Sequence, residues 1–272
     1  MTAPSSLVGF ARRIVADPDP DAKVAYAIDA ARAWRSRSLS LGARSDLRPM
    51  PDRPGRPERP LLLAPRNMPK RSIAGLRGRI ALVHSLAHIE LNAVDLTWDL
   101  VGRFAHVSMP GSFIDDWVQV GLEEATHFRM VSDRLRELGS TYGDLPAHDG
   151  LWQAAQDTGH SLIARIAIIP LVLEARGLDV TPGMIERMRD VGDEATAQVL
   201  EVIYCDERKH VAFGAKWFRY LCGQESKSPE LEFHRLVRLY FKGGLKPPFN
   251  DKARSEAGLT PGFYKPLCSL TG

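Results

Sequence analysis

Cysteine is scarce in this 272-residue chain, and the few cysteines argue against two classes of protein. They are Cys205, Cys222 and Cys268, an odd number with no spacing typical of metal ligands. Neither a disulfide-stapled secreted domain nor a cysteine-based zinc site is therefore supported. A reducing setting is the simpler expectation for such a chain, so we predict a cytoplasmic location.

Long apolar runs and an excess of charge of one sign are also lacking. The most apolar run, 163–173, contains Arg165 and is shorter than the roughly 20 residues that a bilayer-spanning helix needs. The apolar stretch near the N-terminus is interrupted by Arg12 and Arg13, so no signal peptide is expected. A net charge of +3, from 36 basic and 33 acidic residues, is too balanced to argue for nucleic acid. We expect neither a membrane nor a nucleic-acid partner.

Strand-like alternation is not convincing anywhere, whereas helical periodicity is frequent, so the sequence predicts an all-α fold. Residues 5–43 have helical periodicity that is split by Pro18 and Pro20. Gly177 is typical of a helix end, and Thr181 followed by Pro182 is typical of a helix start. The longer predicted helices span roughly 73–105, 113–138, 151–176 and 182–221, the last with a possible break near Gly192.

Two segments differ from this helical pattern. Residues 44–70 contain seven prolines and six arginines, a composition that favours an extended arm over the surface. We expect the arm to pack on its own bundle or on a second subunit; contact with RNA phosphates is the alternative, weakened because no aromatics are interleaved. The tail is rich in proline, glycine and aromatics and is expected to pack on the bundle. The predicted division is 1–43, 44–72, 73–221 and 222–272.

One spacing occurs twice and predicts a metal site. A glutamate is followed by Glu-x-x-His, 34 residues later in the first copy and 33 residues later in the second. The members are Glu90, Glu124 and His127 in the first copy and Glu174, Glu207 and His210 in the second. Residues three apart on a helix share a side, so each Glu/His pair can reach one point. Four helices carrying this set form the ligand pattern of a two-metal carboxylate site in a four-helix bundle.

The neighbours of the two lone glutamates favour the metal hypothesis. Glu90 shares its predicted helix face with Val83, Leu86 and Val94, and Glu174 follows the most apolar segment of the chain. A buried carboxylate without a partner is expensive, and a metal is a natural partner. Alternatively, Glu174 ends its helix and reaches solvent, and a lone Glu-x-x-His is common on solvated faces. Oxygen and nitrogen ligands suit two iron ions, with manganese or a mixed iron–manganese pair as alternatives.

Other residues near the motif are weaker candidates. Glu123 and Asp206 each precede a ligand glutamate and are candidate hydrogen-bond partners for the histidine of the opposing helix; alternatively they are ordinary polar neighbours. Tyr204 lies one turn before Glu207 and is a candidate catalytic phenol for one-electron chemistry, with core packing as the alternative. His84 and His88 lack a third ligand and are not predicted to bind zinc.

These motifs resemble the ferritin-like di-iron carboxylate superfamily, and more narrowly an uncharacterised ferritin-like family of unknown function (DUF455-like). The resemblance covers about residues 73–265 and rests on 88–91, 123–128, 206–210, 246–250, 253–254 and 257–259. It implies a ferritin-like four-helix bundle with extra N-terminal helices, a Pro/Arg-rich arm and a C-terminal extension. It also implies a di-iron site whose ligands are the six residues of the two copies, handling dioxygen or peroxide.

The functional implications of the resemblance leave alternatives open. The favoured expectation is an oxidoreductase, such as a hydroxylase or oxygenase, that acts on a small molecule with an electron donor, neither of which the sequence identifies. An iron storage or detoxification protein and a tRNA-modifying hydroxylase are the alternatives, and whether the chain is an enzyme stays open. A homodimer is an open alternative to a monomer.

Overall fold

The computed structural model is helical, as predicted, and no strand occurs in the part of the chain that it describes, residues 4–42, 49–64, 67, 74–242 and 244–268. The chain divides into two compact units, Met1–Trp152 and Gln153–Gly272. The boundary falls within the short helix α5 (Gly150–Asp157). Each unit carries one copy of the Glu-x-x-His spacing.

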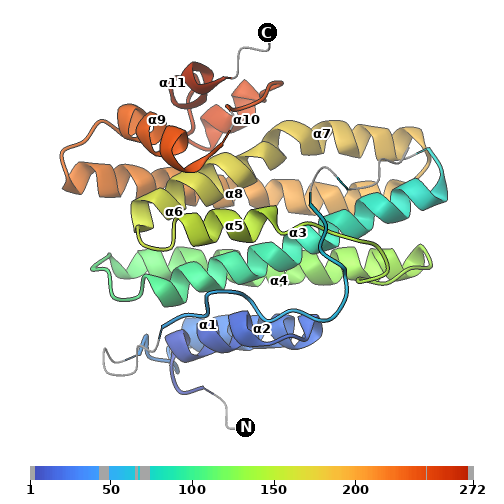
Figure 1. Cartoon of the computed structure of the whole chain (residues 1–272), viewed down its shortest axis with the longest axis horizontal. Coiled ribbons are helices and arrows are strands. Elements are labelled where there is room, and N and C mark those ends of the chain that lie inside the picture. The colour runs from blue at the N-terminus through green and yellow to red at the C-terminus, as the bar shows by residue number, and fades with distance from the viewer. Residues whose placement is uncertain (1–3, 43–48, 65–66, 68–73, 243, 269–272) are drawn as a thin grey trace. The chain divides into compact units, whose positions relative to one another are not determined.

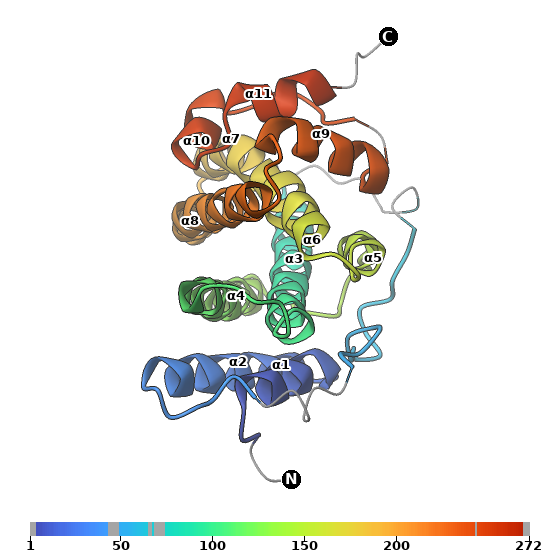
Figure 2. The ribbon, with the colours of Figure 1, turned by 90° about the vertical axis from the view of Figure 1, so that its left-hand side faces the viewer.

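The first unit begins with a helical hairpin, α1 (Leu7–Ala16) and α2 (Pro20–Arg35). The side chain of Ser6 caps α1 by accepting a hydrogen bond from the Gly9 amide, and Pro20 opens α2, where a missing amide proton costs nothing. The split predicted at Pro18 and Pro20 is confirmed. α1 and α2 pack against the longer helices α3 and α4 and run across them (Figures 1 and 2).

The helices α3 (Leu76–Arg103) and α4 (Gly111–Glu137) form the centre of the first unit. They confirm the predicted helices 73–105 and 113–138, except that residue 73 lies outside the described residues. The two helices approach closely at Gly121, where an added Cβ would lie 2.8 Å from Nε1 of Trp98. Since the Trp98 ring is fully buried, this glycine allows the close contact.

The described part of the predicted arm, 49–64, packs on the first unit. The Arg103 guanidinium donates to the carbonyl oxygen of Pro51 at 3.0 Å, and the Gly55 amide donates to that of Val15 at 2.8 Å. Further along, the Leu63 amide donates to the carbonyl oxygen of Ala147 at 2.8 Å. The arm therefore packs on its own chain here; residues 44–48, 65–66 and 68–72 of the predicted arm lie outside the described residues.

The second unit contains a run of helix from α6 (Leu162–Ile168) through a π-helical turn (Ile169–Glu174) to α7 (Ala175–Asp190), followed by α8 (Glu194–Gln224). The prediction that a helix ends at Gly177 and a new one begins at Thr181 is wrong, because Pro182 lies inside α7. The missing amide proton of Pro182 leaves the carbonyl oxygen of Leu178 without its helical donor, and the Asn250 side chain donates to that oxygen instead, at 3.2 Å. The predicted break near Gly192 is confirmed.

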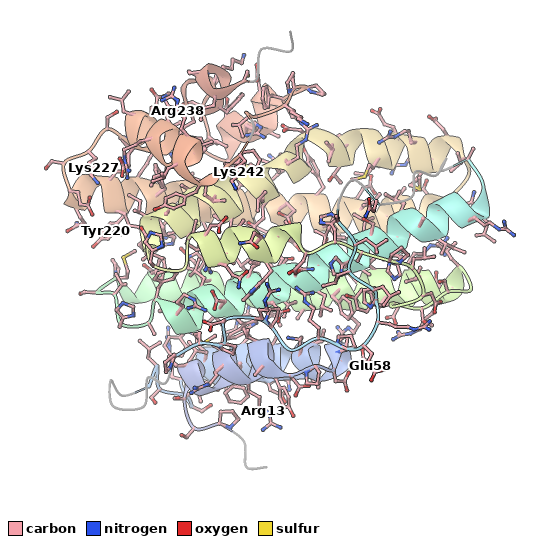
Figure 3. All side chains as sticks on the ribbon, in the orientation of Figure 1. Arg13, Glu58, Tyr220, Lys227, Arg238 and Lys242 are labelled. Carbon is pink, nitrogen blue, oxygen red and sulfur yellow. The ribbon has the colours of Figure 1, made fainter. Side chains whose placement is uncertain are left out.

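The tail of the second unit folds into short helices, α9 (Pro229–Tyr240), α10 (Asp251–Glu256), α11 (Pro261–Tyr264) and a 3₁₀ turn (Lys265–Leu267). It is ordered by packing: α9 contacts α6 and α8, and α10 contacts α7 and α8. The buried Phe233 ring of α9 lies edge-on to Phe218 of α8, with ring centres 5.9 Å apart. Lys227, Arg238 and Lys242 project outward around α9 (Figure 3).

Among the described helices, none is both long enough and apolar enough to cross a lipid bilayer.

Candidate metal centre

The first copy of the spacing forms a buried cluster on two adjacent helices. Glu90 lies on α3, and Glu124 and His127 lie one turn apart on α4. Nδ1 of His127 is 3.4 Å from a carboxylate oxygen of Glu90 and 3.4 Å from one of Glu124. Each of the three side chains offers a ligand atom, and these atoms lie within 4.8 Å of one another. The cluster is inside the protein, since Glu124 and His127 are 0% exposed and Glu90 is 4% exposed.

This donor set fits a divalent metal ion. Two carboxylates brought together in a buried site repel one another, and a cation between them removes that repulsion while replacing lost hydration. Carboxylate oxygen and imidazole nitrogen are donors that iron and manganese accept. The 3.4 Å separations are too long for strong charge-assisted hydrogen bonds, which are about 2.7–2.9 Å, but leave the atoms converging on one point. The first unit therefore contains a buried Glu/His cluster that could bind a metal ion.

The second copy is arranged differently. Glu207 and His210 lie one turn apart on α8, with Nδ1 of His210 3.7 Å from a carboxylate oxygen of Glu207, and both side chains are buried. Glu174 is the last residue of the π-helical turn and is half-buried. Because helix continues beyond Glu174 into α7, it is not the end of a helix that reaches solvent near Gly177, which was the alternative for this residue.

The structure places the weaker candidates in contacts of their own. Glu123 accepts a hydrogen bond from the Gln119 side chain at 2.8 Å, and Asp206 pairs with Lys209 at 2.6 Å, in each case on the same helix. The hydroxyl oxygen of Tyr204 accepts a hydrogen bond from the Asn250 side chain at 3.3 Å. Roles for Glu123 and Asp206 as partners of a ligand histidine, and for Tyr204 in catalysis, stay predictions.

Sequence reasoning missed a tyrosine that contacts α3. The Tyr142 hydroxyl is 2.8 Å from Nδ1 of His88, and Nε2 of His88 is 2.9 Å from the carbonyl oxygen of His148. A carbonyl can only accept, so Nε2 carries the proton and Nδ1 accepts from the tyrosine. Burial lowers the pKa of His88 to about 4 and raises that of Tyr142, which keeps both groups neutral. Tyr142 falls in a Tyr-Gly-Asp sequence whose only signal is a turn.

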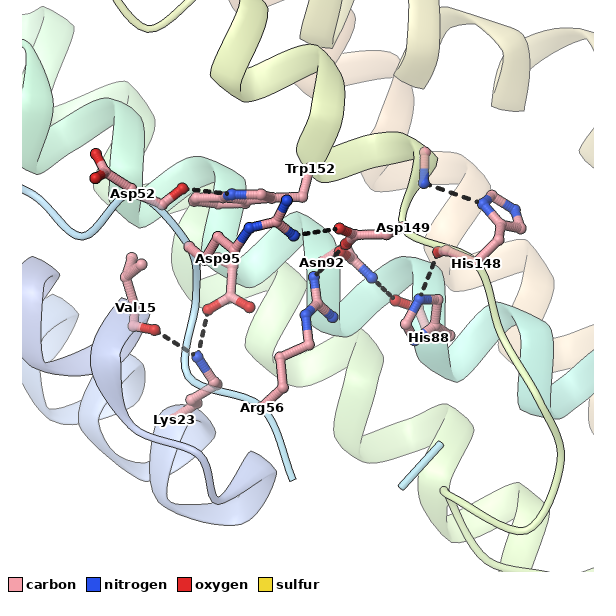
Figure 4. Close-up of polar contacts among 12 residues, drawn as sticks. Val15, Lys23, Asp52, Arg56, His88, Asn92, Asp95, His148, Asp149 and Trp152 are labelled. Carbon is pink, nitrogen blue, oxygen red and sulfur yellow. Dashed lines mark hydrogen bonds and ion pairs between the residues drawn. The ribbon is translucent and has the colours of Figure 1, made fainter. Parts of the chain in front are cut away.

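A buried ion pair supports the same helix. Lys23 of α2 donates to Asp95 of α3 at 2.6 Å and to the carbonyl oxygens of Ile14 and Val15 at 2.9 and 3.0 Å (Figure 4). Burial raises the pKa of Asp95 to about 6, against the opposing effect of Lys23. Burial likewise lowers the pKa of Lys23, and Asp95 opposes this shift. The pair ties the N-terminal hairpin to α3, five residues after Glu90.

Arg56 of the arm extends this polar layer over α3. Its guanidinium donates to the Asn92 side chain at 2.6 Å and lies 3.4 Å from Asp149 (Figure 4). The Asn92 amide in turn donates to the carbonyl oxygen of His88 at 2.6 Å. The arm, α3 and the residues before α5 are thus linked by direct hydrogen bonds and an ion pair.

A comparison with protein-family models shows the family of this chain. A family model described as "Protein of unknown function (DUF455)" matches residues 16–265. An uncharacterized protein from Haemophilus influenzae is 41% identical over 209 residues, which are 75% of this chain and 73% of that relative. No solved structure matches the chain. With nearly the whole chain matched by one family model, the protein belongs to the DUF455 family.

Proposed function

We propose that this protein is a ferritin-like oxidoreductase whose centre holds two metal ions, preferably iron, and activates dioxygen or peroxide. The observation that carries the proposal is the buried cluster of Glu90, Glu124 and His127, whose ligand atoms lie within 4.8 Å of one another. A repeat of the same residue types on α8 supplies a second set. The proposal includes a cytoplasmic setting, a small organic substrate and an electron donor.

In this proposal the two sets share one centre. Glu124 and His127 would hold one ion, Glu207 and His210 would hold the other, and Glu90 and Glu174 would complete the ligand set, as in two-metal carboxylate bundles. Four glutamates balance the charge of two divalent ions. When bound, such ions supply electrons to dioxygen or peroxide and so generate an oxidant.

The contribution of the protein side chains is to orient donors and exclude bulk water. The buried imidazole of His127 must be neutral to bind a metal, and the buried carboxylates must be ionised. Metal binding is therefore expected to release protons and to weaken as the solution is acidified. Buried apolar residues of the same two helices, such as Val94 and Phe128, would limit access of water to the centre.

The test is anaerobic titration with Fe(II), followed by exposure to air. Two ions per chain should bind, and oxidation should produce a near-ultraviolet charge-transfer band that a chain lacking His127 does not give. The variants are His127→Ala and Glu207→Ala, one in each set. Glu137→Gln, at the exposed end of α4, is the matched control and should behave as the wild-type protein does.

Binding of less than one ion per chain by the wild-type protein contradicts the proposal. Equal binding by the wild type and both variants contradicts it as well, because ions would then be held elsewhere. Size-exclusion chromatography distinguishes this proposal from iron storage in a large assembled shell. Elution as a monomer or dimer supports the proposal, and elution as a large shell contradicts it.

A further inference from the structure

The C-terminal tail forms hydrogen bonds with the start of α7, directly after the π-helical turn that carries Glu174. The Arg254 guanidinium donates to both carboxylate oxygens of Asp179, at 2.8 and 2.7 Å, and to the carbonyl oxygen of Ala175 at 3.2 Å. The backbone amide of Asn250 donates to a carboxylate oxygen of Asp179 at 2.9 Å. The contacts of Arg254 and Asn250 with α7 are called the tail clamp. The clamp begins at the residue immediately after Glu174.

The tail clamp is buried and geometrically specific. The side chains of Asp179 and Arg254 are 0% and 3% exposed, and the guanidinium lies over the Phe249 and Tyr264 rings, 5.1 and 4.7 Å from their centres. A buried ion pair is not an efficient source of stability, because desolvation offsets much of the attraction. Its bidentate geometry does fix orientation, which suits a device that sets the position of a helix.

The π-helical turn before the clamp needs such support. A turn of this kind is rare and is found mostly at functional sites. One residue more or less in a helical turn rotates the next part of the helix by about 100°, so the direction of Glu174 depends on this turn. Pro170 lies inside the turn, and Gly214 of α8 approaches it so closely that an added Cβ would lie 2.7 Å from Cβ of Pro170. Gly214 is one turn after the predicted ligand His210.

The same tail also joins α7, which follows Glu174, to α8, which carries Glu207 and His210. Asn250 donates from one side-chain nitrogen to the carbonyl oxygen of Leu178 on α7 at 3.2 Å and to the Tyr204 hydroxyl on α8 at 3.3 Å. The first of these bonds replaces the donor that Pro182 lacks. Tyr204 precedes Glu207 by one turn. The tail therefore holds α7 near Glu174 and α8 near Glu207.

We propose that Arg254 and Asn250 are positioning residues that hold Glu174 in the register needed to ligate metal. The inference rests on the proposed function, because it assumes that Glu174 is a ligand. Asp179 lies five residues after Glu174, as Asp95 lies five residues after Glu90. Each of these buried aspartates pairs with a cationic side chain from an accessory segment, which is the N-terminal hairpin for Asp95 and the C-terminal tail for Asp179. The tail clamp is the counterpart of the Lys23–Asp95 pair.

The test measures Mn(II) binding by calorimetry and Mn(II) electron paramagnetic resonance in the full chain. Arg254→Met should weaken the affinity for one Mn(II) ion about 10–100-fold, the usual effect of losing a group that orients a ligand. Arg254→Lys, which restores charge but not the bidentate contact, should lose less. Asp251→Asn is the control, since Asp251 bonds Tyr264 and Lys265 rather than α7.

A double-variant cycle separates positioning from general damage. If Arg254 acts through Glu174, adding Arg254→Met to Glu174→Gln should cause no further loss of Mn(II) affinity, and the two single variants should share one resonance spectrum. Unchanged affinity in Arg254→Met, or additive losses in the double variant, overturns the proposal. Should Arg254→Met fail to fold, Asn250→Ala, which leaves the ion pair intact, takes its place with the same expected results.

Hydrogen–deuterium exchange without metal distinguishes failure of this inference from failure of the proposed function. The wild-type protein failing to bind Mn(II) or Fe(II) contradicts the metal function alone. The exchange rate of the backbone amides in residues 169–178 then tests the tail clamp. This rate should be higher in Arg254→Met than in Asp251→Asn. Equal exchange in the two variants overturns the inference.

Discussion

The two copies of the Glu-x-x-His motif have nearly the same residue spacing but are built on different backbones. In the first unit, Glu90 lies within the regular helix α3 and joins Glu124 and His127 in a closely spaced buried cluster. In the second, Glu174 lies at the end of a π-helical turn and is less buried. Similar ligand spacing therefore does not require similar local structure. Both units share a buried aspartate, five residues after the lone glutamate, that pairs with a cation from an accessory segment.

The accessory segments come from opposite ends of the chain. In the first unit a lysine of the N-terminal hairpin fills this role, and in the second an arginine of the C-terminal tail does. The lysine makes a single contact with its aspartate and two with backbone carbonyls, whereas the arginine makes a bidentate contact. The bidentate arginine accompanies the less regular backbone, which is where orientation needs the most support.

The largest expected effect comes from a substitution that breaks the Lys23–Asp95 ion pair of the first unit. Lys23→Ala leaves the Asp95 carboxylate buried without its cation and should reduce the free energy of unfolding by about 3–5 kcal/mol. Chemical denaturation measures the change. Arg32→Ala, which removes an exposed pair with Asp29, is the control and should cost less than about 1 kcal/mol. A loss of that small size for Lys23→Ala would show that the pair does not tie the hairpin to α3.

The second prediction uses the pKa of Asp95, which burial raises to about 6 against the opposing charges of Lys23 and Arg56 and with a small contribution from Asp99. Between pH 4 and pH 6 the unfolded chain has lost this proton and the folded chain keeps it. Stability from this group is therefore greatest at low pH and falls as pH rises to about 6, by at most about 3 kcal/mol.

Asp95→Asn tests this pH dependence. The stability of the wild-type protein minus that of the variant should decrease from pH 4 to pH 6 and then stay level to pH 7. Denaturant titrations at each pH provide the values. A difference that rises with pH would mean that Lys23 holds the pKa of Asp95 below its usual value.

The third and smallest effects concern two glycines of the second unit. Gly214→Ala should destabilise by about 1–3 kcal/mol, because its Cβ would overlap Pro170 in the π-helical turn. Gly177→Ala should instead be neutral or stabilise by up to about 1 kcal/mol, since Gly177 lies inside α7 with open space around it. Thermal unfolding compares the two. Destabilisation by Gly177→Ala would restore the sequence-based prediction of a helix end there.

The sequence predicted the parts of the fold that depend on local periodicity. The helical class, the hairpin split at Pro20 and the break near Gly192 result from regular apolar spacing and from glycine and proline at positions where those residues end helices. The first cluster was also predictable from spacing alone, because Glu124 and His127 lie one turn apart on a regular helix and Glu90 lies on its neighbour.

Local patterns could not supply contacts between distant segments. Pro182 is tolerated inside α7 because Asn250, far along the chain, replaces the missing hydrogen-bond donor. The π-helical turn packs closely against Gly214, and a helical period of 3.6 residues reveals neither the turn nor this contact. Tyr142 is brought to His88 by the loop after α4. Residues 253–254 of the tail contribute to the family resemblance, but the sequence does not show that Arg254 pairs with Asp179.

The central claim is that the two sets of ligands converge on one pair of ions, and X-ray absorption of the iron-loaded wild-type protein tests it most directly. The account predicts nitrogen and oxygen neighbours and a second iron atom about 3.5–4 Å from the first. Two bound ions per chain with no iron–iron distance in this range would contradict it, because each set would then bind an isolated ion.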